Sequence, residues 1–134
     1  MSRPRNTPRP LVYSCSGCSD VAQLANQVAL RLDHGGEAEM SCIAGVGGGV
    51  PGLVRTARSG RPIVAIDGCQ MHCAHHCLAN AGVAPTEHVR LYEQGLKKRK
   101  GRLYDEHTVA SVTVGVSALI ARLPMDSAAG GEPA

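Results

Sequence analysis

Aromatic side chains are scarce in the 134-residue chain, which has no Phe, no Trp and only three Tyr. Nucleic-acid modules that stack bases on surface rings need such side chains, so this composition argues against them. No stretch approaches the roughly 18 apolar residues of a membrane span, and the basic N-terminus lacks the apolar segment of a secretory signal. We therefore expect a cytoplasmic protein that binds neither nucleic acid nor a membrane, with a protein partner left open.

The net charge of +3 is mild, and much of the positive charge lies in the first nine residues and in the run Lys97–Lys100. A run of like charges is usually a solvated face, so we expect the second run to be a solvated basic surface without a specific anion site. Both chain ends are poor in residues that could be buried. Residues 1–9 are predicted to be a disordered basic tail and residues 124–134 a second disordered tail, around one domain at 10–123.

Between these ends, short apolar segments alternate four times with helical patterns. The predicted strands are 11–14, 38–43, 62–66 and 88–93. The predicted helices are 21–32, 53–59, 69–81 and 109–123, with Ser19 or Asp20 capping the first and Asp105 the last. This repeated β–α order predicts a single α/β domain with a four-stranded parallel sheet, Rossmann-like or flavodoxin-like, and helices on both faces.

Six cysteines lie close to the ends of the first three predicted strands. They follow the first strand (Cys15, Cys18), end the second (Cys42) or follow the third (Cys69, Cys73, Cys77). In a compartment where thiols stay reduced, such cysteines indicate metal ligands or reactive thiols rather than disulfides. The carboxyl ends of parallel strands meet at one edge of a sheet. The sequence therefore predicts a shared thiolate site at that edge.

If residues 69–81 form one helix, its geometry limits which cysteines can share a metal ion. Cys69 and Cys73 would lie one turn apart on one face, about 6 Å along the axis. Cys77 would lie about 12 Å from Cys69, whereas the sulfurs on one zinc ion are only about 4 Å apart. Cys77 is therefore predicted to lie outside the metal site. Cys77 and Cys18 remain candidates for an additional ligand or a redox thiol.

The other residues of the same segment are expected to support the cysteines. Its apolar stripe should face the sheet and consists of Met71, Ala74, Leu78 and Ala81. His72 and His76 are expected beside the cysteine face as hydrogen-bonding neighbours of the ligands, and His75 is expected in solvent. At the turn before the helix, Asp67 would cap it or accept another hydrogen bond, and Gly68 would permit a tight backbone.

Three patterns in the sequence suggest sites other than a metal site. The segment CSGC at 15–18, between a strand and a helix, is typical of a thioredoxin-like dithiol, but such an enzyme does not need Cys42, Cys69 or Cys73. A thiol phosphatase would need an arginine where position 21 has Val. The glycine-rich stretch 45–49 lacks the lysine of a P-loop and the spacing of a dinucleotide site, so it is predicted to be a tight turn beside the cysteines.

Four sequence blocks occur in a characteristic order: CSG at 15–17, NQVAL at 26–30, MSCIAGVGG at 40–48 and IDGC at 66–69, with a cysteine four residues later. Together they resemble the DGC-domain proteins, small bacterial and archaeal proteins described as zinc-binding because of four potential chelating cysteines. The resemblance covers about residues 10–100. It implies that the four family cysteines are Cys15, Cys42, Cys69 and Cys73 here, while Cys18 stands where better-known members often have a small residue such as alanine.

Ligation by sulfur alone suits zinc or an iron–sulfur cluster. Four protein ligands close the coordination shell of zinc, which favours a structural or metal-handling role over an enzyme. The sequence therefore predicts one zinc ion held by Cys15, Cys42, Cys69 and Cys73 at the carboxyl edge of the sheet. The alternative is a redox protein that uses an iron–sulfur centre or a Cys15/Cys18 dithiol.

Overall fold

Aliphatic residues build four parallel strands in the computed structural model, which describes residues 8–124. The strands are β1 (Leu11–Ser14), β2 (Glu39–Met40), β3 (Ile63–Asp67) and β4 (Glu87–Arg90). They form one sheet in the order β2-β1-β3-β4, with every neighbouring pair parallel. This order matches the first four strands of a flavodoxin-like sheet, so the predicted α/β fold is confirmed.

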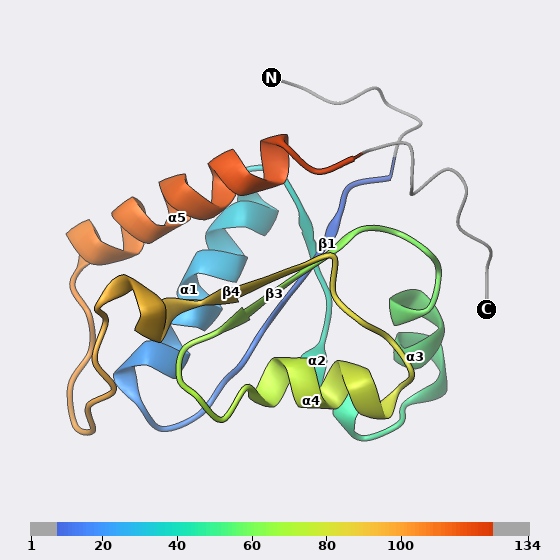
Figure 1. Cartoon of the computed structure of the whole chain (residues 1–134), viewed down its shortest axis with the longest axis horizontal. Coiled ribbons are helices and arrows are strands. Elements are labelled where there is room, and N and C mark those ends of the chain that lie inside the picture. The colour runs from blue at the N-terminus through green and yellow to red at the C-terminus, as the bar shows by residue number, and fades with distance from the viewer. Residues whose placement is uncertain (1–7, 125–134) are drawn as a thin grey trace.

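Helices cover both faces of the sheet (Figure 1). They are α1 (Asp20–His34), α2 (Ile43–Gly47), α3 (Pro51–Ala57), α4 (Cys73–Asn80) and α5 (Glu106–Ala121), with a short 3-10 turn, η1 (Leu91–Gln94), after β4. α1 and α5 pack on one face, and α2, α3 and α4 pack on the other. Because the strands are all parallel, the loops that leave their carboxyl ends share one edge of the sheet.

The two central strands supply side chains to two separate cores, because successive residues of a strand point to opposite faces. Val12, Val64 and Ile66 pack with α1 and α5, whereas Tyr13 and Ala65 pack with the helices of the other face. All five residues of β3 are buried, as expected for a parallel strand covered on both sides. These aliphatic layers hold β1 and β3 rigidly beside each other.

Part of the glycine-rich stretch after β2 forms the short helix α2, so the tight turn predicted at 45–49 is confined to Gly48 and Gly49. A Cβ on Gly45 would lie 2.0 Å from Leu53 Cδ1, so the absence of a side chain lets Leu53 pack directly on the α2 backbone. Gly49 has a φ of 76° and reverses the chain before α3. β2 is also shorter than predicted, because the chain turns at Cys42 to begin α2.

The predicted caps are present at both long helices. Ser19 Oγ accepts a hydrogen bond from the backbone N–H of Ala22 at 3.3 Å, and Asp105 Oδ1 accepts one from Thr108 at 2.9 Å. The predicted tails lie outside the described residues except at positions 8, 9 and 124. Of these, the carbonyl of Arg9 accepts hydrogen bonds from the Arg61 guanidinium. Within residues 8–124, no helix is long and apolar enough to cross a membrane.

Candidate thiol site at the carboxyl edge of the sheet

β1 and β3 lie side by side at the centre of the sheet, although β2 comes between them in sequence. Ligands of open α/β sheets bind outside the carboxyl ends of the strands, where the strand order reverses in this way. The loops that leave β1 and β3 here carry Cys15 and Cys69. Cys15 is 7% exposed, and its Sγ accepts a hydrogen bond from the backbone N–H of Gly68 at 3.2 Å. The two central loops therefore touch through a cysteine.

The last residue of β3, Asp67, holds the start of α4. Its carboxylate is 1% exposed and accepts hydrogen bonds from the backbone N–H groups of Ala74 at 2.8 Å and His75 at 3.1 Å. These are the second and third residues of the helix, whose donors an N-cap side chain normally satisfies. The residue before the helix, His72, makes no such bond and has a left-handed φ of 55°. Because Asp67 does the capping across the turn, α4 begins at Cys73.

Gly68 is required at its position because α1 approaches the turn closely. A Cβ on this residue would lie 2.6 Å from the backbone oxygen of Val21, a distance that no side chain tolerates. The glycine therefore lets the turn after β3 pack on the first turn of α1, next to the loop that contains Cys15. The Asp-Gly-Cys sequence thus places a helix anchor, a close contact and a thiol on three consecutive residues.

The prediction of one helix over 69–81 is wrong in its first turn. Cys69 lies in the turn before α4, so Cys69 and Cys73 are not the expected one-turn pair on a helix face. That spacing belongs to Cys73 and Cys77, and the axial distance used to exclude Cys77 no longer applies. Met71 does not face the sheet either, since it is 64% exposed.

Cys77 and Cys42 lie where α4 meets α2. A Cβ on Gly47 would lie 2.8 Å from Cys77 Sγ, so the glycine provides the space that this sulfur occupies. Burial raises the pKa of the Cys77 thiol, and the neighbouring Cys73 adds to the rise. Cys42 is exposed at the start of α2, where its Sγ accepts a hydrogen bond from Gly45 N–H at 3.4 Å.

The environment of Cys15 shows which thiols are its neighbours. Burial raises the pKa of the Cys15 thiol to about 11. The hydrogen bond from Gly68 opposes this rise, and negative charge at Asp67, Cys69 and Cys73 adds to it. Two of the other predicted ligands, Cys69 and Cys73, are therefore close enough to Cys15 to act on its thiol electrostatically.

Cys42 contributes to the raised pKa of Tyr13, which burial raises most and the Ser41 hydroxyl lowers. Among residues 8–124, no group of three or more His, Cys, Asp or Glu side chains is arranged to hold a metal ion. The donor chemistry still fits a thiophilic metal, because the thiols lie on loops and helix starts at one edge of the sheet.

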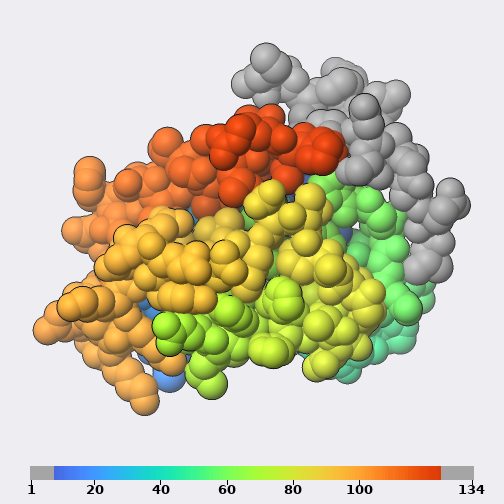
Figure 2. Space-filling model, viewed as in Figure 1, coloured from blue at the N-terminus to red at the C-terminus, as the bar shows by residue number. Residues whose placement is uncertain are grey.

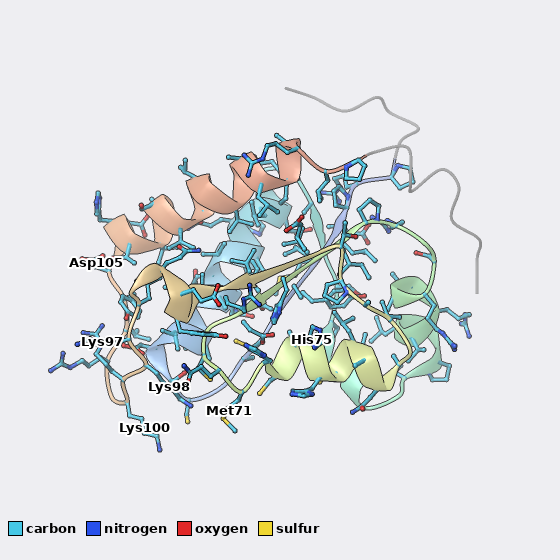
Figure 3. The ribbon with its side chains drawn as sticks, viewed as in Figure 1. Met71, His75, Lys97, Lys98, Lys100 and Asp105 are labelled. Carbon is cyan, nitrogen blue, oxygen red and sulfur yellow. The ribbon has the colours of Figure 1, made fainter. Side chains whose placement is uncertain are left out.

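Three histidines and a tyrosine surround the Asp67 carboxylate and the start of α4. His88 Nε2–H donates to Asp67 Oδ2 at 2.8 Å, and His72 Nε2 lies 2.7 Å from the Tyr92 hydroxyl. The ring centroid of His88 is 4.8 Å from that of His72 and 4.9 Å from that of His75. Figure 3 shows His75 on the side of α4 that faces the sheet. The prediction that His75 lies in solvent is therefore wrong.

His88 and Tyr92 had no signal in the sequence, since they follow α4 and reach it only through the fold. Burial lowers the pKa of His88, although the hydrogen bond to Asp67 opposes the shift, so the imidazole is neutral at pH 7. His76 is exposed, with its ring 6.2 Å from that of His75. His72, His75 and His88 thus surround the anchor of α4.

The run Lys97–Lys100, which we term the basic strap, is held more firmly than a solvated surface. Arg99 donates to the fully buried Asp20 carboxylate through its backbone N–H at 2.7 Å and its Nε at 2.5 Å. Burial alone would raise the pKa of Asp20, but the hydrogen bonds and charge of Arg99 hold that pKa below its ordinary value. The prediction of a merely solvated run is therefore wrong at Arg99.

We expect Cys15 to be the slowest of the six thiols to react in the folded, metal-free protein. Its pKa of about 11 lies two units above the ordinary value of 9.0, so its thiolate is about 100-fold scarcer at pH 7, apart from any steric protection. Exposed Cys18 is the internal comparison. Alkylation by iodoacetamide, mapped by mass spectrometry, measures both rates. Equal rates in the folded protein, rather than only in urea, would contradict the buried position of Cys15.

Comparisons with known proteins found one matching family and a similar protein. The family model of the DGC domain matches residues 11–116. A protein from Pseudomonas aeruginosa, named Anaerobic and virulence modulator AnvM, is 67% identical over 99 residues, which cover 74% of this chain and 76% of that protein. No solved structure matches the chain significantly.

Proposed function

The chain belongs to the DGC-domain family, and from this membership and the placement of its thiols we propose that it is a metal-binding protein. The metal we propose is one zinc ion held by Cys15, Cys42, Cys69 and Cys73. Zinc bound in this way would act as a cross-link between the loops that follow β1, β2 and β3. Because four protein ligands leave no open position, the role would be structural or metal-handling.

The observation that carries this proposal is the hydrogen bond from Gly68 N–H to Cys15 Sγ at 3.2 Å. It joins the loops of the two central strands through a sulfur atom, one residue before Cys69. A turn conformation at Cys69 also favours the proposal, because a turn can adjust to the sulfur–sulfur distance of about 4 Å that zinc requires. A rigid helix would fix the two thiols farther apart along its axis.

Cys42 would complete the site from the other side of α4. It caps α2, and α2 packs on α4 through the contact between Gly47 and Cys77. Its only hydrogen bond in the described structure is the weak one to Gly45 N–H at 3.4 Å. Metal binding would replace that bond with a much stronger one, and it would release protons because each ligand must be a thiolate.

A second candidate function is redox chemistry at an iron–sulfur centre on the same cysteines. The Pseudomonas aeruginosa relative is named for anaerobic modulation, and thiolate-bound iron–sulfur centres suit conditions without oxygen. The dithiol alternative is less well supported. A nucleophilic cysteine needs a lowered pKa, whereas burial raises the pKa of Cys15 to about 11.

Anaerobic purification followed by metal analysis and an absorption spectrum tests these candidates. The proposal expects a colourless protein with one zinc ion per chain and no loss of secondary structure on chelation, since two aliphatic cores hold the sheet. A brown protein with visible absorbance and bound iron would favour the iron–sulfur centre instead. A protein that binds neither metal after reconstitution under reducing conditions would refute both metal-based functions.

A further inference from the structure

The basic strap lies directly against the cysteine loops. Its centre is fixed by the Arg99–Asp20 contacts, and Lys100 forms an antiparallel backbone bridge with Ser19. Asp20 N–H also donates to the Arg99 carbonyl at 3.0 Å, so the strap is paired with the segment that follows Cys18. Figure 2 shows the atoms of the strap region beside those of the loop after β3 at one end of the molecule. These contacts fix the backbone of the strap next to the loop that contains Cys18.

One of these side chains reaches the sulfur atoms of the loop after β3. Lys98 Nζ lies 3.6 Å from Cys69 Sγ and 3.9 Å from Met71 Sδ, and Figure 3 shows Lys98 on the same side of the molecule as Met71. An ammonium group can only donate, and a neutral thiol or thioether is a weak acceptor. The same contact becomes a charge-assisted hydrogen bond when Cys69 is a thiolate.

The proposed site needs positive charge close by. One zinc ion with four thiolates carries a net charge of −2 (four negative and two positive charges), and the buried Asp67 carboxylate lies beside it. His88 is neutral at pH 7 because burial lowers its pKa. Within residues 8–124, the ammonium group in contact with a cysteine sulfur is that of Lys98.

We propose that the basic strap is part of the thiol site, with Lys98 as a positioning residue that holds Cys69 and balances the charge of the bound thiolates. Arg99 and Asp20 fix the strap, and Lys98 reaches from it to Cys69. The lysine therefore orders the turn before α4 for metal capture. This inference rests on the proposed metal-binding function for its role, although the Lys98–Cys69 contact exists without metal.

The experiment compares three variants with the wild type. Lys98→Met keeps an unbranched side chain, one atom shorter, and removes the charge. Lys98→Arg keeps the charge, and Lys97→Met removes an equal charge from the neighbouring exposed position of the strap. Zinc affinity is measured by competition with a chromophoric chelator at low and high salt. The alkylation rate of Cys69 in the metal-free protein is measured at one fixed pH.

For Lys98→Met we expect zinc affinity and the alkylation rate of Cys69 to fall about two- to fivefold, as for one exposed charge pair, with the difference shrinking at high salt. Lys98→Arg should restore most of both values, and Lys97→Met should change neither. Equal effects of Lys98→Met and Lys97→Met, or no rescue by arginine, would overturn the proposal. If no variant or wild type binds zinc, the proposed function fails, and the alkylation rates alone decide whether Lys98 controls Cys69.

Discussion

Replacing any one of Cys15, Cys42, Cys69 or Cys73 with serine should weaken zinc binding by about 100-fold or more, since loss of a ligand exceeds the 10- to 100-fold cost of changing an outer neighbour. Each substitution leaves an open coordination position and removes one of the four zinc–sulfur bonds. Cys15 should show the largest loss, because its buried sulfur already joins the loops after β1 and β3 through Gly68. Hydroxyl oxygen is a poor replacement for a thiolate on zinc.

Cys77→Ser is the matched control on the same helix as Cys73. Its sulfur packs against Gly47 of α2 and not in the loops that follow β1 and β3, so we expect full zinc stoichiometry in this variant. The measurement is zinc per chain after dialysis against a weak chelator, with circular dichroism to show that each variant is folded. If Cys77→Ser loses zinc while Cys42→Ser retains it, the fourth ligand is Cys77 and our assignment of Cys42 is wrong.

Exposed Cys18 gives a further comparison with Cys15 in the same loop. If Cys18→Ser keeps its zinc, the extra cysteine of the CSGC segment is not a ligand. If it loses zinc as Cys15→Ser does, Cys18 belongs to the site. Fast alkylation of Cys18 in the zinc-loaded wild type would instead point to a reactive thiol.

The sheet and the edge that carries the thiols could be predicted because both depend on local patterns. The run at 62–66 is continuous and β-branched, and it forms the fully buried central strand β3 with a shift of one residue. In α5, a helical period relates Val109, Val112, Val116 and Ile120, and these four residues are buried. Apolar periodicity and capping residues are patterns within a few positions of the chain. The sequence therefore contains the information needed to predict these strands and helices.

The details of the site could not be predicted because they depend on contacts between distant residues. Asp67 caps α4 by accepting hydrogen bonds from backbone N–H groups seven and eight positions later in the chain. This capping places the start of the helix after Cys69. Arg99 reaches Asp20 across 79 positions, and Lys98 reaches Cys69 across 29. A charge run looks the same in sequence whether it is solvated or clamped to a buried carboxylate.

The glycine-rich segment shows a different limit of sequence patterns. Several glycines in a row usually indicate a turn, yet Gly45 and Gly47 lie in a helix because Leu53 and Cys77 occupy the space beside them. Glycine costs helix stability by roughly 1 kcal/mol at each position relative to alanine. That cost is offset only by packing that the fold supplies, and no local pattern reveals it.

Replacing Asp67 with alanine should lower the free energy of unfolding by about 2–4 kcal/mol, the cost of leaving buried donors without an acceptor. The change removes the acceptor for Ala74 N–H, His75 N–H and His88 Nε2–H at once. The first turn of α4 would then fray, and zinc affinity should fall with it because Cys73 begins that turn. Asp67→Asn keeps one acceptor oxygen but presents an amide NH2 group to the remaining donors. Its decrease in the free energy of unfolding should therefore be about half as large.

Asp105→Ala is the control for Asp67→Ala, since Asp105 caps α5 by the same kind of bond at an exposed position. An exposed cap is worth about 1 kcal/mol, and Asp105 lies far in sequence from every cysteine. Urea denaturation measures the decrease in the free energy of unfolding of each variant, and the chelator competition measures its zinc affinity. A decrease in Asp67→Ala no larger than that in Asp105→Ala, or unchanged zinc affinity in Asp67→Ala, would show that Asp67 does not anchor the site. We expect Asp67→Ala to lower both the free energy of unfolding and zinc affinity. We expect Asp105→Ala to lower the free energy of unfolding slightly and to leave zinc affinity unchanged. This difference would distinguish anchoring of the site from ordinary helix capping.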